Sequence, residues 1–170
     1  MIEYSPEYHS PAPPKGLIVD RAAAGCLAAA VTAATAFGML LGMGHRSTTA
    51  WRPINALAHL IVGARADDVF GPQLVVTPAG CAVVLVMSAL AGIAIAGLAS
   101  SRRTLHIVMA TGGVALAGYL VHAHIAARTP GGLAALLTLG ELRALYASVA
   151  IATFLGMRYA LAPISAVHPE

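Results

Sequence analysis

Long stretches without a charged side chain restrict the possible folds of this chain more than any other feature. The first contains the 23 residues between Arg21 and His45, and as an α-helix it would be about 34 Å long. A hydrocarbon core of about 30 Å needs roughly 20 apolar residues to cross it. Because 58% of the 170 residues are apolar and 10% are charged, we predict an integral membrane protein and exclude an ordinary soluble globule.

These stretches predict an all-α fold, a four-helix bundle in which every long helix spans the membrane. We expect the spans at about residues 17–44, 77–100, 104–127 and 141–162, inside a single membrane domain over residues 16–165. Pro78 suits the first turn of the second span, and Arg102 with Arg103 suits a tight turn after it. The sequence Thr-Pro-Gly-Gly at residues 129–132 ends the third span.

The start of the fourth span has two interpretations. Only 14 residues separate Arg143 from Arg158, so a helix over 141–162 requires both arginines to extend towards the lipid headgroups. The preceding residues 133–139 then form a separate interfacial turn, which is the arrangement we predict. In the alternative, one helix starts at Leu133 and holds Glu141 and Arg143 against protein.

The first 15 residues are polar and rich in proline, which predicts a disordered tail that docks on a partner subunit. Glu3 and Glu7 precede the first apolar run, whereas a cleaved signal peptide begins with a basic region, so we expect the first span to be retained.

Polar residues recur at helical spacing in the segment between the first two spans. Arg52, Asn55 and His59 are separated by three and four residues and therefore share one side of a helix. The apolar residues on the other side are Ile54, Leu57, Leu60 and Ile61. We predict a short amphipathic helix at about residues 53–63, lying in the membrane interface with Trp51 as its headgroup anchor. A packed loop is the alternative.

The same segment carries the pattern P-x-N-A-x-x-H, which begins at Pro53 and precedes a glycine-containing span. With this pattern, residues 51–100 resemble uncharacterised small four-span bacterial inner-membrane proteins. The resemblance implies that Asn55 and His59 form a selected polar face, and it brings no known activity with it.

Small residues recur every fourth position in three of the spans. The three series are Ala24, Ala28, Thr32 and Ala36; Ser88, Gly92, Ala96 and Ser100; and Ala144, Ser148, Ala152 and Gly156. In lipid, such series let helix backbones approach closely, so we expect Gly92 and Gly156 to lie at helix contacts. An alanine-rich composition would also produce some of these series by chance.

The basic residues decide little about orientation, because four spans place five of them on each side. Arg102 and Arg103 lie in the shortest loop, where positive charge has most weight, and so favour a cytoplasmic location for both termini. Nine of the ten basic residues are arginine, a bias typical of GC-rich bacteria, and we expect the bacterial inner membrane. Membrane lipids and other membrane subunits are the expected partners, and the dispersed net charge of +3 argues against nucleic acid.

No motif of nucleophilic catalysis, phosphate binding or zinc proteolysis occurs in the sequence, and no catalytic residue or dedicated metal site is predicted. Cys26 and Cys81 both begin successive antiparallel spans, so they lie at opposite membrane faces and are not expected to form a disulfide.

The seven histidines are the one unusual chemical feature. His45, His59, His122 and His124 all belong to the membrane face opposite the termini and are the candidate cofactor-binding residues, for a b-type haem or a metal ion. His122 and His124 are about 200° apart on a helix, so they cannot face one site unless the helix unwinds. Our preferred interpretation is that these side chains bond headgroups, loop carbonyls and carboxylates, with no cofactor.

Three functions therefore remain. We favour a non-catalytic accessory or structural subunit of a larger bacterial membrane complex, of respiratory or photosynthetic type, which acts through helix packing and tail docking. The alternative is a small haem- or metal-binding membrane redox protein. The third is a small transporter, although no span carries a mid-membrane acid or base.

Overall fold

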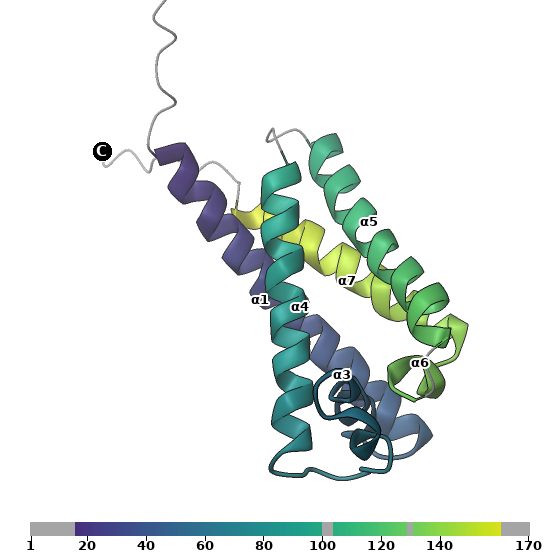
Figure 1. Cartoon of the computed structure of the whole chain (residues 1–170). Helices are drawn as coiled ribbons and strands as arrows, with labels where there is room; N and C mark the ends of the chain where they lie inside the picture. The colour runs from purple at the N-terminus through teal and green to yellow at the C-terminus, as the bar shows by residue number, and fades with distance from the viewer. Residues whose placement is uncertain (1–15, 100–103, 129–130, 161–170) are drawn as a thin grey trace, which may run out of the picture.

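The computed structural model describes residues 16–99, 104–128 and 131–160, and within them the chain is helical with four candidate membrane spans. The long helices are α1 (Gly16–Ser47), α4 (Val76–Leu98), α5 (Thr104–Leu120) and α7 (Leu139–Ala160). By length and composition, each can cross a membrane, with the third span continuing to Ile125. Figure 1 shows the predicted all-α bundle, and its four long apolar helices make the protein a multi-pass membrane protein.

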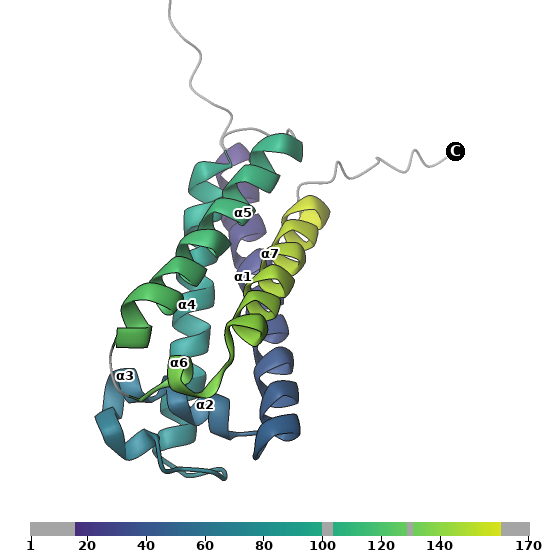
Figure 2. The same ribbon diagram turned by 90° about the vertical axis from the view of Figure 1, so that its right-hand side faces the viewer.

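Helix α1 lies at the centre of the arrangement. It packs against α4 and against α7, and α5 packs mainly against α7. Helices α4 and α5 follow each other in the chain but contact each other much less extensively. The start of α1 and the end of α7 lie at one end of the bundle, and the short helices lie at the other (Figures 1 and 2). The bundle is therefore least tightly closed between α4 and α5.

Helix α1 approaches its two neighbours at small residues. A Cβ atom added to Gly92 of α4 would lie 2.6 Å from the Gly25 carbonyl oxygen, and one added to Gly156 of α7 would lie 3.4 Å from the Ala28 Cα. Ala24 and Ala28 are buried at these contacts, as their spacing predicts. In the series on α7, however, Ala144 is exposed, and Ser100 lies outside the described residues.

A pair of threonine hydroxyls joins α1 to α7 inside the bundle. Thr153 donates to the Val149 carbonyl at 2.7 Å, which uses its single hydroxyl proton. Thr32 therefore donates the hydrogen bond that links it to Thr153. Both side chains are almost fully buried. Because a membrane interior has no water to bond these hydroxyls, they bond each other and the helix backbone instead.

The predicted helix at 53–63 is divided in the structure. Helices α2 (Arg52–Leu57) and α3 (His59–Val62) meet at Ala58, and a 3-10 turn, η1 (Gly63–Ala66), follows. Every residue of α2 after Arg52 is buried, because this helix packs against α4 and closes the end of the bundle. Ile61, expected in lipid or in the bundle, is 60% exposed on α3.

Two further boundaries differ from the expectation. Helix α5 ends at Leu120, and the chain continues as one π-helical turn, η2 (Val121–Ile125), and a 3-10 turn, η3 (Ala126–Arg128). Helix α7 begins two residues earlier than predicted, at Leu139. The tail 1–15, the turn at 100–103, the dipeptide 129–130 and residues 161–170 lie outside the described residues.

The predicted separation of residues 133–139 from the fourth span is present. Helix α6 (Leu133–Leu136) is followed by Leu137, whose backbone is extended. Thr138 then caps α7 with a reciprocal pair of bonds, in which Glu141 N–H donates to the Thr138 hydroxyl at 3.2 Å and Thr138 N–H donates to the Glu141 carboxylate at 2.9 Å. This capping box sets the start of α7 locally.

Replacing Thr138 with alanine is expected to lower the free energy of unfolding by about 1 kcal/mol, because it removes the acceptor for a backbone N–H of the first helical turn. Glu141→Ala should have a similar effect, whereas Glu141→Gln keeps an acceptor oxygen and should be nearly neutral. Denaturant titration of the purified protein in mixed micelles measures all three. A loss of 1 kcal/mol with Glu141→Gln would show that charge, and not capping, matters at this position.

Candidate functional site

Asn55 joins α2 to the loop that precedes α4. Its Nδ2 group donates to the Val69 carbonyl at 3.1 Å and to the Gly71 carbonyl at 2.9 Å. Its Oδ1 atom accepts from the Thr77 hydroxyl at 2.8 Å, so all the polar atoms of a fully buried side chain have partners. The donor and acceptor ends of the amide are assigned by this network, because the two loop carbonyls can only accept.

Thr49 completes the arrangement by donating to the Phe70 carbonyl, which lies between the two carbonyls bound by Asn55. The Thr77 hydroxyl in turn accepts from Gln73 N–H at 2.8 Å. We call Thr49, Asn55 and Thr77, with the carbonyls of residues 69–71, the Asn55 cluster. The cluster thus supplies side-chain donors to three consecutive carbonyls of the loop, those of Val69, Phe70 and Gly71.

The second polar contact is between His59 and Asp67. The Nδ1 atom of His59 lies 3.0 Å from both carboxylate oxygens of Asp67, and the same carboxylate accepts from Gly132 N–H at 3.0 Å. Gly131 and Gly132 have φ values of +90° and +72°, and a Cβ on Gly131 would lie 2.2 Å from the carboxylate. The carboxylate therefore joins α3 to the segment before α6, and glycine is required there for conformation and for space.

Arg52 and Trp51 lie at the start of α2. The guanidinium carbon of Arg52 is 4.2 Å from the centre of the Phe70 ring, a cation–π contact. Trp51 occupies the N-cap position and is 36% exposed. The spacing of Arg52, Asn55 and His59 places them on one side, and all three contact the segment of residues 67–71.

The four candidate histidines have different surroundings. His59 bonds Asp67, and His122 Nδ1 lies 2.7 Å from the Tyr146 hydroxyl, whereas His45 and His124 are exposed. His122 and His124 do not share a site, although the helix widens to a π turn where they lie. In the described part of the chain, no three His, Cys, Asp or Glu side chains are placed to hold one metal ion. Cys26 and Cys81 are free thiols, as expected.

The sequence patterns do not single out Tyr146, and they do not predict the hydrogen bonds of Asp67 and Thr77. Tyr146 is one of five tyrosines in a chain with few aromatic residues, and it lies inside a span. A phenol in such a place needs a hydrogen-bond partner, which is the signal that could have singled it out. The contacts of Asp67 and Thr77 depend on the path of a loop, which carries no periodicity.

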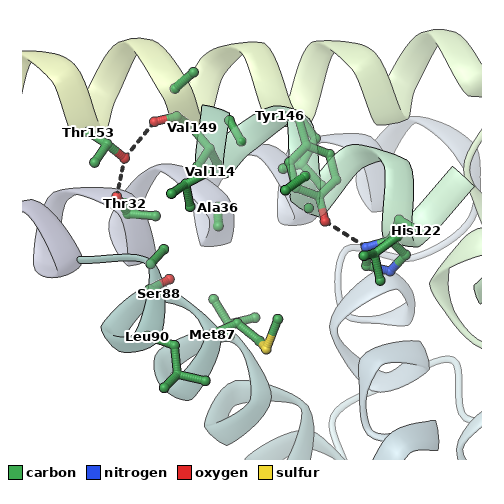
Figure 3. Close-up of a pocket in the computed structure, with 18 of the residues that line it drawn as sticks. Thr32, Ala36, Met87, Ser88, Leu90, Val114, His122, Tyr146, Val149 and Thr153 are labelled. Atoms are coloured by element: carbon green, nitrogen blue, oxygen red, sulfur yellow. Dashed lines mark hydrogen bonds between the residues drawn. The ribbon is translucent and has the colours of Figure 1, made fainter. Parts of the chain in front are cut away.

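A cavity of about 390 Å³ lies between α1, α4, α5 and α7 (Figure 3). We call it the α4–α5 cavity. Its wall is mostly apolar, and His122 and Tyr146 lie at the end of it away from Thr32 and Thr153. The other polar side chains that line it are Thr32, Ser88, Thr111 and Thr153.

Comparisons of the chain with protein-family models, with curated proteins and with solved structures returned no match. The resemblance noted from the P-x-N-A-x-x-H pattern therefore remains an expectation.

Proposed function

We propose that the protein is a non-catalytic accessory subunit of a larger membrane complex in the bacterial inner membrane, with both termini cytoplasmic. The proposal rests on an uncovered face of α1 that is suited to packing against another membrane helix. This face consists of Ala30, Ala34, Gly38 and Gly42, which we call the Gly38 face.

All four residues of the Gly38 face are exposed, and no described atom lies within 4 Å of a Cβ added to Gly38 or Gly42. Other small residues of α1 are covered, since Ala24 and Ala28 nearer its start are buried where α4 and α7 approach. The contrast supports a partner helix outside the chain, because small residues in a membrane helix favour close backbone contact with another helix.

The spacing of the face agrees with this interpretation. Gly38 and Gly42 form a G-x-x-x-G motif in a long apolar helix, the pattern by which membrane helices associate at short distance. Phe37 and Leu41 are both partly buried, so these side chains beside the glycines pack towards the bundle and leave Gly38 and Gly42 exposed.

The double variant Gly38→Ile/Gly42→Ile is expected to release the protein from its complex. The added side chains would keep a partner backbone away, and loss of about 1.4 kcal/mol or more lowers the association at least tenfold. The protein, tagged at its chromosomal locus, is solubilised in mild detergent and followed by native gel and quantitative mass spectrometry. The wild type should migrate with a defined partner subunit at fixed stoichiometry, and the variant should migrate alone.

The matched control is Gly97→Ile/Gly112→Ile, which adds the same side chains at glycines of α4 and α5 that also have open space around them. This control should remain in the complex. A wild type that migrates alone, or only with copies of itself, would contradict the accessory-subunit function, as would a Gly38→Ile/Gly42→Ile variant that stays bound.

A further inference from the structure

We propose, independently of the accessory role, that the α4–α5 cavity is a binding site for an uncharged amphiphile with one apolar chain and a carbonyl- or hydroxyl-bearing head. The cavity volume of about 390 Å³ lies within the range of roughly 300–1,000 Å³ that is typical of small-molecule sites. Such sites combine an apolar wall with a few polar groups at fixed places, which is also the composition of this wall.

The cavity opens sideways between α4 and α5. Met87 and Leu90 of α4 and Val121, directly after α5, line it and are 59%, 55% and 52% exposed. All three lie inside candidate membrane spans, so the opening faces the hydrocarbon region. The weak contact between α4 and α5 leaves this side open, and a ligand dissolved in the membrane can enter without passing through water.

The His122–Tyr146 pair can bind the head of the ligand in either tautomer of the imidazole. If the Tyr146 hydroxyl donates to His122 Nδ1, the Nε2–H group remains as a donor. If Nδ1–H donates instead, the Tyr146 hydroxyl keeps its proton for the ligand. In both cases, the pair retains one donor, which suits a carbonyl or hydroxyl oxygen.

The threonine hydroxyls that line the cavity donate their hydrogen bonds to acceptors within the protein. Thr111 donates to the Ile107 carbonyl at 2.8 Å, and Thr153 and Thr32 donate within the α1–α7 contact. Apart from the Ser88 hydroxyl, the cavity beyond the His122–Tyr146 pair is therefore an apolar environment that suits a chain. Because His122 lies in the turn that follows α5, the head would lie towards the membrane face where α5 ends, and the chain would extend inwards.

The head should be uncharged. Among the described residues that line the cavity, none is Lys, Arg, Asp or Glu. A carboxylate or phosphate placed there would lose its hydration without gaining an opposite charge, which is strongly unfavourable. Isoprenoid quinones and monoacylglycerols both have the required chemistry.

The test uses the full chain in lipid nanodiscs with a photoactivatable monoacylglycerol as the probe. We expect the label on the residues of α1, α4, α5 and α7 that line the cavity, and competition by excess monoolein or decylubiquinone. Oleate, which has the chain of monoolein but a charged head, should compete at least tenfold less well. The stronger of the two uncharged competitors identifies the source of the natural ligand.

Two variants test the wall and the head contact. Ala91→Phe places a ring in the cavity and should reduce labelling at least tenfold, while Ala82→Phe, at an exposed position of α4 outside the cavity, should not. The double variant His122→Leu/Tyr146→Phe should abolish the preference of monoolein over oleate. Labelling of the wild type away from the residues that line the cavity, labelling that no excess of monoolein displaces, or equal competition by oleate would each overturn the proposal, whether or not the variants fold.

Discussion

Asn55→Leu is expected to lower the free energy of unfolding by about 3 kcal/mol, one of the largest effects of any single substitution in this chain. The leucine fits the space of the amide but leaves the Val69 and Gly71 carbonyls and the Thr77 hydroxyl without their bonds. Each net bond contributes about 1 kcal/mol, and a buried group left unpaired costs more. The midpoint of denaturation in mixed micelles reports the loss.

Two substitutions at this place separate packing from hydrogen bonding. Ile54→Leu conserves volume at a fully buried neighbour and should cost less than about 1.5 kcal/mol. Asn55→Asp keeps an acceptor for Thr77 but cannot donate to the two carbonyls, so it should be nearly as damaging as Asn55→Leu. Equal, small effects of Asn55→Leu and Ile54→Leu would mean that the segment is only a linker.

Gly80→Ala is expected to have a comparable effect for a different reason. The added Cβ atom would lie 2.0 Å from the Ile54 carbonyl oxygen and 2.8 Å from its carbon, so α2 would have to move away from α4. Overpacking of this type costs about 1–3 kcal/mol, and the upper part of the range applies because the obstacle is backbone. The same denaturation experiment measures the loss.

Gly97→Ala in the same helix is the matched control. No described atom lies within 4 Å of a Cβ at Gly97, so the substitution should be neutral or stabilising by about 0.5–1 kcal/mol through helix propensity. Because Gly80 meets a backbone atom of Ile54, the second substitution Ile54→Ala should not rescue Gly80→Ala. Rescue by Ile54→Ala would contradict the backbone contact.

The parts of the fold that could be predicted from sequence are those that local chemistry decides. Long uncharged runs predict the four spans, because a bilayer selects for length and apolarity. The break before α7 follows from Thr138 and Glu141, whose capping bonds lie within one turn. The divergence of His122 and His124 follows from helical geometry alone.

The candidate site could be predicted only in part from the sequence. The spacing of Arg52, Asn55 and His59 correctly places them on one side, but it does not say that Asn55 is buried or that it donates to two loop carbonyls. That information lies in residues 67–71, which have no periodicity and whose path depends on α4. Amphipathic spacing indicates only that a face is polar, and a loop or the membrane interface can satisfy it equally well.

The sequence by itself determined the number and approximate extent of the spans, the polar face of α2 and α3, and the small residues that permit close helix contact. Only the tertiary structure decided which of those small residues are used: Gly92 and Gly156 meet α1, while Gly38 and Gly42 remain uncovered. It also decided that α4 and α5 separate and leave a cavity beside His122 and Tyr146. The physical reason is that membrane helices have no hydrophobic force between them to specify partners, so contacts depend on the fit of whole surfaces that no local pattern records.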